Sequence, residues 1–382
     1  MRFTRLKLES WKNFKKVDVE LANRVFVIGA NASGKSNFLE VFRFLHDLTV
    51  DGGGLAKAVS LREGMSKLRS LHATSNSAIL IEAHVMDDAG EEWTYTLEFD
   101  TPSKKSTEVL VTREVVTRGK RTLLNRPSEK DVADRALLKQ TALEQVAANK
   151  DFRSLADFFR TIRFMNLVPQ LIREGQTSPR VFPGQDPLGR DFLQDISAAS
   201  DRLRKSRLSR IEKVLRKAVP QFENLRFERD DRGYPHLAVG FKHWRTKAAK
   251  QRESQLSDGT LRLIGMLWTL QDKAGPLLLE EPEWSLHSGL LERLAPFISR
   301  MLRHGGGRQV FITTHSERML ADQGISPNEI LLVVPSEKSG SEIKQAARDG
   351  IIQKAMHRGL SAAEAALPHT RIETMNLFGV VA

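Results

Sequence analysis

The chain has 382 residues, of which 40% are hydrophobic and 28% are charged, and it contains no cysteine. The absence of cysteine excludes disulfide bonds and cysteine-based zinc or redox sites. The formal net charge of +12 favours polyanionic partners, nucleic acid above all, although an ordinary basic protein would show the same balance. No window of about eighteen apolar residues occurs and residues 1–7 lack a signal core, so we expect a cytoplasmic protein with no membrane partner.

The N-terminal elements lead into a glycine-rich turn. Residues 2–9 and 17–21 alternate between apolar and polar side chains. Residues 25–28 are an apolar run within a strand expected at residues 24–28, so three strands are predicted in all. A helix with an apolar stripe follows at residues 38–48. The turn between them, residues 29–36, reads Gly-Ala-Asn-Ala-Ser-Gly-Lys-Ser. A strand, a turn spaced G-x-x-x-x-G-K-S and a helix together predict a phosphate-binding loop.

Each residue type in this loop has a chemical reason. Gly29 and Gly34 let the backbone bend so that successive N–H groups point at phosphate oxygens. The following helix presents amide donors and its positive dipole end to the same anion. Lys35 adds a charge near the β- and γ-phosphates, and the Ser36 hydroxyl can ligate Mg²⁺. The predicted nucleotide contacts in this stretch are Gly29, Ala30, Asn31, Ala32, Ser33, Gly34, Lys35, Ser36 and Asn37.

The middle of the chain has a different pattern. From residue 78 to about 124 the apolar period is two, which predicts antiparallel strands. Residues 128–171 are expected to be mainly helical, and residues 175–189 to form a loop. A strongly basic helix is predicted over residues 202–219, and a hairpin over residues 225–241.

That helix and a second basic run at residues 242–252 are the candidate DNA surface. Neutralisation of phosphates drives sequence-independent DNA affinity, although a solvated basic face is the alternative. The residues chosen as contacts with double-stranded DNA are Arg204, Arg207, Arg210, Lys247 and Arg252.

Three short motifs follow the loop in order. Residues 256–260, Leu-Ser-Asp-Gly-Thr, precede a predicted helix, so Ser257 and Gly259 can approach a γ-phosphate. An apolar strand at residues 277–280 ends in Glu280 and Glu281; in phosphate-loop ATPases the first acid holds Mg²⁺, usually through water, and the second orients the attacking water. His315 follows a strand predicted at residues 309–313. Each motif alone could be structural, but their order favours a shared site.

These motifs resemble those of ABC-type ATPases. Leu-Ser-Asp-Gly-Thr is similar to their LSGGQ signature, His315 to their switch histidine, and residues 284–287 to their D-loop. Residues 5–15, which include Trp11-Lys12-Asn13-Phe14, are similar to the opening of RecF and SMC proteins. The whole set resembles RecF-like and OLD-like ATPases of the "AAA family". We expect neither the Toprim domain of OLD nucleases nor the long coiled coil of SMC proteins.

The resemblance implies an α/β fold. It is a P-loop NTPase of the ABC head type, with a mixed sheet, an antiparallel β subdomain and an inserted helical lobe. The expected parts are an N-terminal ATPase lobe at residues 1–127, a mainly helical insertion with the basic helix at 128–250, and a C-terminal ATPase lobe at 251–382.

The resemblance also implies a mechanism. ATP with Mg²⁺ would be hydrolysed to ADP and phosphate between two copies that pair head to tail, with Ser257 and Gly259 acting in trans. Glu281 and His315 would be catalytic. Ser36, Glu280 and Gln170 would bind the metal, and Lys12 and Asn13 would also bind the nucleotide.

Two functions are open at this stage. The first is an ATPase whose ATP-dependent dimerisation is coupled to DNA binding in repair, chromosome maintenance or anti-phage defence. The alternative is a regulatory ATPase that senses a trigger and controls a separate effector, a nuclease or a toxin. A transporter subunit is disfavoured, because the distance from the loop to the signature is about twice the usual one.

Overall fold

The computed structural model describes residues 1–73, 77–103, 106–174, 188–242, 249–272, 275–284, 286, 288–304 and 307–370. The chain divides into two units: unit 1 comprises Met1–Arg163, Ala274–Leu278 and Arg308–Ala382, and unit 2 comprises Phe164–Lys273 and Leu279–Gly307. No helix within the described ranges is both long and apolar enough to cross a membrane. The three-part division made from the sequence stays a prediction.

Unit 1 contains most of a mixed sheet, in which the residues of β8 and β12 are divided between the two units. The order of the twelve strands is β7-β6-β5-β4-β1-β2-β15-β14-β3-β13-β12-β8. Strand β3 runs parallel to β13 and to β14, whereas the pairs from β7 to β2 are antiparallel. The bounds are β1 (Arg2–Trp11), β2 (Phe14–Glu20), β3 (Arg24–Ile28), β4 (Ile79–Met86), β5 (Glu92–Asp100), β6 (Leu110–Arg118), β7 (Arg121–Arg126), β8 (Arg163–Met165), β12 (Leu277–Glu280), β13 (Val310–Thr314), β14 (Ile330–Ser336) and β15 (Gly340–Gln345).

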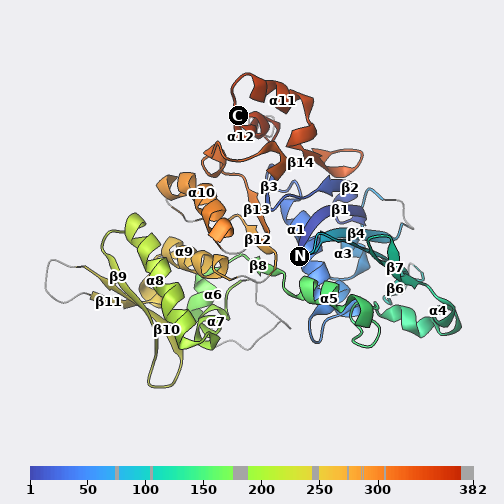
Figure 1. Cartoon of the computed structure of the whole chain (residues 1–382), viewed down its shortest axis with the longest axis horizontal. Helices are drawn as coiled ribbons and strands as arrows, with labels where there is room; N and C mark the ends of the chain where they lie inside the picture. Colours follow the sequence, from blue (N-terminus) through green and yellow to red (C-terminus); the bar gives the residue numbers. More distant parts are fainter. Residues whose placement is uncertain are drawn as a thin grey trace, which may run out of the picture. The chain divides into compact units, whose positions relative to one another are not determined.

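The antiparallel part of the sheet follows directly from its sequence. In β4 buried and half-buried residues alternate without exception, and Ile79 and Ile81 are fully buried. This is the period that places alternate side chains on opposite faces of a sheet. Figure 1 shows these strands as a blue-to-green wing, with α4 (Glu129–Ala133) at its outer end. The predicted mixed sheet with an antiparallel subdomain is thus confirmed.

Aromatic packing fixes the helix that follows the phosphate-binding loop. Helix α1 (Lys35–Thr49) buries Phe42, whose ring centroid lies 4.9 Å from that of Phe3 in β1 and 4.4 Å from that of Phe311 in β13. Phe3 also stacks on Phe159 of α5 (Arg153–Arg160) at 5.7 Å. Full burial of each such ring stabilises the fold by roughly 1.5–3 kcal/mol. The start of α1 is therefore anchored to the sheet.

The expectation of a mainly helical segment over residues 128–171 is wrong for residues 163–165, which form strand β8, and for residues 140–149, which form turns. The reason for the turns is the carboxylate of Glu114, which is fully buried in β6. It accepts hydrogen bonds from the backbone N–H groups of Ala142 at 2.7 Å and Leu143 at 3.2 Å. Arg126 also donates to Glu114 and to the carbonyl of Gln140. These backbone groups serve side chains instead of a helix.

The sequence pattern did not predict several shorter elements of unit 1. These include β7, β15 and the described helices that follow β15. The remaining helices of the unit are α2 (Leu55–Ser60), α3 (Met65–Leu68), η1 (Arg135–Lys139), η2 (Lys150–Phe152), η4 (Met319–Ala321), η5 (Pro327–Glu329), η6 (Ala346–Arg348), α11 (Gly350–His357), α12 (Ala362–Ala366) and η7 (Leu367–Thr370).

Unit 2 combines helices with a three-stranded antiparallel sheet of order β11-β10-β9. The basic helix, α8, buries Leu208, Ile211 and Leu215 and packs against this sheet (Figure 1). The predicted basic helix and hairpin are confirmed, while residues 175–187 of the expected loop lie outside the described residues. The elements are α6 (Pro169–Glu174), α7 (Phe192–Ala198), α8 (Asp201–Ala218), β9 (Phe222–Arg229), β10 (Pro235–Phe241), β11 (Ala249–Arg252), η3 (Glu253–Gln255), α9 (Asp258–Leu270) and α10 (Ser288–His304).

Candidate nucleotide site

The phosphate-binding loop of unit 1 has the backbone that its glycines predict. Gly34 caps α1 with φ 109°, in the left-handed region that favours glycine, and a Cβ there would collide with the Asn13 amide. A Cβ on Gly29 would lie 2.6 Å from the Ser33 hydroxyl and from the carbonyl oxygen of Val333. Both glycines are thus required for the close approach of the chain to itself.

Lys35 closes the loop from within. Its side chain is buried, and Nζ donates to the carbonyl oxygens of Gly29 at 2.9 Å and Ala30 at 3.0 Å. Residues 35–37 form the first turn of α1, where a helix has amides without intrahelical acceptors and the positive end of its dipole. Backbone N–H groups and one cation in such an arrangement can hold an anion.

Asn13 holds the loop from the outside. Its Nδ2 donates to the Ser33 carbonyl at 3.0 Å and to the Ser341 hydroxyl at 2.7 Å, while its Oδ1 accepts from Asn37 at 2.9 Å. Ser341 in turn donates to the same Ser33 carbonyl at 2.6 Å. Asn13 was assigned to the site from the sequence, whereas Ser341 carried no signal that could have found it. The contacts make Asn13 a support of the loop.

Lys12 and His315, also predicted site residues, belong to unit 1. Lys12 precedes Asn13 with φ 48°, and burial lowers the pKa of its ammonium group. His315 is exposed and directly follows β13, where Thr314 pairs with Ile28 of β3. Because the two strands are parallel, His315 and Gly29 leave the sheet at the same edge. The histidine is thus placed at the loop by register.

The acidic pair lies in unit 2, at the end of β12. Glu280 Oε2 accepts from the side-chain amide of Asn166 at 3.3 Å. Glu281 adopts φ 40°, and its Oε2 accepts from the indole N–H of Trp284 at 2.6 Å. Sequence reasoning missed Asn166, whose only signal is that it is the first polar residue after β8. The two carboxylates therefore have separate partners, an amide and an indole.

The signature turn forms the start of α9. Ser257 is its N-cap: Oγ accepts from the Thr260 N–H at 3.3 Å and contacts the Thr260 hydroxyl at 2.8 Å. Arg173 donates to Asp258 and to the Leu256 carbonyl, both at 2.7 Å. Gln170 donates to Asp258 at 2.9 Å. Gln170 thus contacts the signature in this structure, and its role at a metal stays a prediction.

Among the described residues, no three His, Asp or Glu side chains gather as a metal site. Mg²⁺ at nucleotide sites usually keeps several waters and takes only one or two protein ligands plus phosphates. The use of Ser36 and Glu280 for the metal stays a prediction.

The five residues chosen for DNA contact have different surroundings. Arg204 donates to the carbonyls of Ser197 and Ala199 at 2.9 and 3.1 Å, and its guanidinium lies 4.2 Å from the Phe227 ring centroid. Arg207 lies over the Trp268 ring at 5.1 Å and donates to the Gln271 carbonyl at 3.4 Å. These two side chains are only 14% and 13% exposed, so they hold unit 2 together.

The other three residues divide differently. Arg210 is exposed on α8. Arg252 pairs with Glu228 at 3.2 Å, which offsets its charge locally. Lys247 lies outside the described residues. Of the five, Arg210 is therefore the described residue whose position best suits a nucleic-acid contact.

Comparisons with known proteins bear on this arrangement. Residues 24–321 match the family model AAA_21, described as "AAA domain, putative AbiEii toxin, Type IV TA system". Endonuclease GajA of Bacillus cereus (strain VD045) is 34% identical over 67 residues, which are 18% of this chain and only 12% of that protein. A solved SMC head bound to the C-winged helix domain of ScpA covers 90% of this chain and 98% of its own, at 17% identity and a TM-score of 0.55.

The likeness to the SMC head confirms the predicted fold class, and the family match covers most of the chain, including the phosphate-binding loop and the signature. The chain therefore belongs to the AAA_21 family of ATPase domains, and its fold is that of an SMC head.

Proposed function

We propose that this protein hydrolyses ATP at a composite site shared by two copies of the chain. The observation that carries the proposal is the closed phosphate-binding loop, in which Lys35 Nζ bonds to Gly29 and Ala30 beside the N-terminus of α1. His315 at the same sheet edge supports a γ-phosphate at that position. The order of the loop, signature, acidic pair and histidine along the chain supports a second copy as the source of Ser257.

Each residue has a proposed task. The loop amides and Lys35 bind the triphosphate, and His315 contacts the γ-phosphate. Glu281 holds the attacking water and accepts its proton, for which Trp284 must release its carboxylate. Ser257 of a second copy completes the site from the far side of the phosphates.

The metal has its own proposed residues. Mg²⁺ would neutralise phosphate charge, and Ser36 and Glu280, directly or through water, would hold it. Asn166 orients the Glu280 carboxylate through the bond that joins the two side chains in unit 2.

The ATPase rates of three variants, each compared with the wild-type rate, test this proposal. We expect Glu281→Gln to bind ATP but to hydrolyse it at least about a hundredfold more slowly, because it loses the general base. Lys35→Ala should lose binding itself. Ser10→Ala, at a buried position outside the loop, is the control and should retain the wild-type rate. A wild-type rate for Glu281→Gln would refute the assigned role of that residue.

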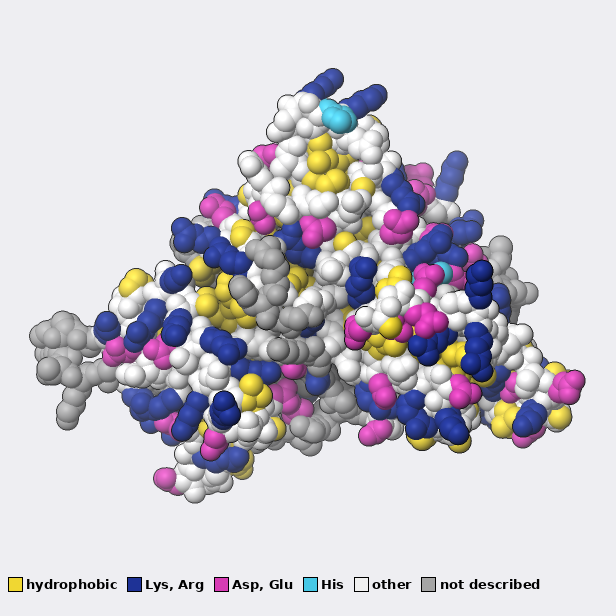
Figure 2. All heavy atoms as spheres, viewed as in Figure 1, with side chains coloured by type: hydrophobic (Ala, Val, Ile, Leu, Met, Phe, Trp, Pro, Cys, Tyr) yellow, Lys and Arg dark blue, Asp and Glu magenta, His cyan; other side chains and the backbone are white. Residues whose placement is uncertain are grey.

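The output that we favour is DNA binding coupled to ATP. Figure 2 shows Lys and Arg side chains gathered over the part of the molecule that contains α8 and its sheet. Arg202, Lys205, Arg210 and Lys213 are exposed on α8, and such a row of cations suits a phosphate backbone. A rise of ATPase activity with double-stranded DNA would support this output, and an unchanged rate at low salt would count against it.

A second output is control of a separate effector in defence. It is favoured by the internal partners of Arg204 and Arg207, which leave fewer cations for DNA than the sequence suggested. The description of the matched family names a toxin, and the similar SMC head was solved with a protein partner. These two properties belong to those proteins, and they suggest a protein partner for this chain. A stable complex with one effector protein, without DNA, would favour this output.

A further inference from the structure

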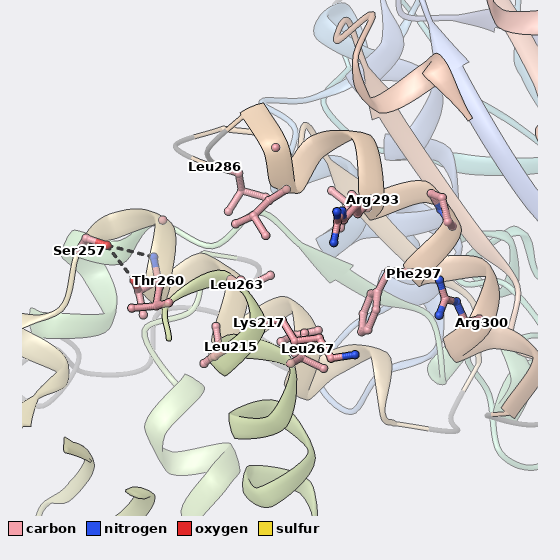
Figure 3. A pocket seen from close by; sticks show the side chains of 17 residues that line it. Leu215, Lys217, Ser257, Thr260, Leu263, Leu267, Leu286, Arg293, Phe297 and Arg300 are labelled. Carbon is pink, nitrogen blue, oxygen red and sulfur yellow. Dashed lines mark hydrogen bonds between the residues drawn. The ribbon is translucent and has the colours of Figure 1, made fainter. Parts of the chain in front are cut away.

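A groove lies within unit 2 between the helices α8, α9 and α10, with a volume of about 900 Å³ (Figure 3). Leu215 of α8, Leu263 and Leu267 of α9, and Phe297 of α10 point into it. Most of its described lining is apolar, and it extends over about two turns of α9, since Thr260 and Leu267 both line it. This size suits one face of a short helix better than a small polar ligand.

The mouth of the groove is positively charged. Lys217, Arg293 and Arg300 line it and are exposed, and no ion pair within the described part of the chain neutralises them. None of the described lining residues is acidic. Figure 2 shows hydrophobic side chains beside α10 with Lys and Arg side chains around them. An apolar floor with a cationic rim is complementary to a helix that carries leucine-type residues on one face and carboxylates beside them.

One end of the groove is the signature turn itself, because Ser257, Gly259 and Thr260 belong to its lining. In Figure 3 the hydrogen bonds of Ser257 to Thr260 lie at this end. A molecule in the groove would therefore touch the residues that cap α9. Occupancy and the position of Ser257 are thus physically linked.

We propose that this groove is the docking site for an acidic amphipathic helix of a partner protein. The helix would bury its leucine-type side chains on Leu263, Leu267 and Phe297, and its carboxylates would pair with Arg293 and Arg300. Docking would alter the access of Ser257 to a second copy, so it would change the ATPase rate. Only this last consequence rests on the function proposed above.

The charges favour this occupant over two others. A second copy that docked through the same surface would bring two sets of Lys217, Arg293 and Arg300 to one interface, and like charges there cost binding energy. DNA would suit the cations, but its phosphates would leave the apolar floor without a partner. A helix with both features satisfies floor and rim together.

Binding of labelled synthetic peptides tests the proposal. The probe is a fluorescein-labelled amphipathic peptide with leucine on one face and glutamate on the other, followed by fluorescence anisotropy on the full chain carrying Lys35→Ala, so that ATP turnover has no influence. The comparison peptides are a scrambled sequence of the same composition and a version with lysine in place of glutamate. A double-stranded DNA oligonucleotide serves as competitor.

The variants separate this groove from the rest of the basic surface. Arg293→Glu/Arg300→Glu should weaken the acidic peptide about tenfold or more, which corresponds to about 1.4 kcal/mol, and should improve the lysine peptide. Phe297→Ala should weaken both. Lys205→Glu/Arg210→Glu makes the same charge change on α8 outside the groove and should leave peptide affinity within about twofold.

Equal affinity for the acidic, lysine and scrambled peptides would overturn the proposal, and so would no effect of Arg293→Glu/Arg300→Glu on acidic-peptide binding. Competition by DNA that these two substitutions abolish would instead make the groove a DNA site. Dimers that Phe297→Ala dissociates would show that a second copy fills the groove. If peptides bind as expected but leave the wild-type ATPase rate unchanged, the docking site stands and the proposed link to Ser257 falls.

Discussion

The indole N–H of Trp284 donates a hydrogen bond to Glu281 Oε2 over 2.6 Å, and Trp284 is itself 55% exposed. The carboxylate that we assign to water activation is thus held by a side chain that solvent or another molecule can reach. Glu281 has φ 40°, a conformation that non-glycine residues seldom adopt. Under the proposed mechanism, this contact belongs to a resting state and is released when two copies assemble the site.

Trp284→Phe therefore should raise the basal ATPase rate by a few-fold, since it removes the N–H donor but keeps an aromatic ring; a hydrogen bond to a charged group contributes about 1.5–3 kcal/mol when buried and less when exposed. The rate is measured on dilute protein with saturating ATP. The same change in the Glu281→Gln background should have no effect. A fall in rate as large as that of Glu281→Gln would instead make Trp284 a residue that positions the carboxylate for catalysis.

Asn13→Ala should weaken nucleotide binding, because the Asn37 side chain loses its acceptor and the Ser33 carbonyl keeps only the Ser341 hydroxyl as a side-chain donor. Loss of a buried hydrogen-bonding partner costs about 1–3 kcal/mol. Binding of a fluorescent ATP analogue and thermal unfolding measure the two effects.

Ser341→Ala provides the matched test, because its hydroxyl joins both Asn13 and the Ser33 carbonyl. In a double-mutant cycle the costs of the two substitutions should not add, since both act on one cluster. Additive costs would show that Asn13 and Ser341 support the loop independently.

Stability should fall in acid through Asp131. Its hydrogen bonds with Arg126 lower the pKa of this carboxyl from 3.8 to about 2, so it stabilises the folded state above pH 3.8 and loses that contribution as the pH falls toward 2. The contribution at neutral pH is about 2 kcal/mol. Burial raises the pKa of neighbouring Glu114, which acts in the opposite direction.

Urea unfolding at pH 7 and pH 3 isolates the Asp131 part. Asp131→Asn should lower the free energy of unfolding at pH 7 by about 2 kcal/mol and flatten its change between the two pH values. An equal pH dependence in the wild type and the variant would contradict the role of the Arg126 pair.

Arg204→Ala should destabilise the protein without a specific effect on DNA affinity. Its guanidinium bonds to two carbonyls and covers Phe227, and loss of such contacts costs about 1–3 kcal/mol. Arg210→Ala should do the reverse, with unchanged stability and a shallower salt dependence of DNA binding. Chemical unfolding and DNA titrations at two salt concentrations measure both. If the Arg204→Ala variant were fully stable but bound DNA more weakly, Arg204 would be a DNA contact and not a structural residue.

Local patterns carried most of the information about the nucleotide site. The loop between β3 and α1 is recognisable because its bends need glycine at Gly29 and Gly34 and its charge needs Lys35, whatever surrounds them. Strand β4 was equally plain from its alternation. These features depend on residues close in the chain.

Features that depend on distant partners could not be predicted. Ser341 reaches the loop from more than three hundred residues away, and nothing near it indicates that contact. Apolar residues within 140–149 have helical spacing, yet the backbone N–H groups of Ala142 and Leu143 donate hydrogen bonds to the buried carboxylate of Glu114. The sequence places Arg204 and Arg207 on a DNA-binding surface, but neighbouring aromatic rings and carbonyls hold both side chains.

Mixing two inactive variants shows whether one ATPase site is formed by two copies of the chain. Lys35→Ala lacks a working phosphate-binding loop and Ser257→Ala lacks a working signature, so each alone should be nearly inactive. In a mixed dimer the loop of one and the signature of the other form one intact site. We predict that ATPase activity returns on mixing, to at most about half of the wild-type rate per dimer. No recovery on mixing, or full activity of Ser257→Ala alone, would contradict the account.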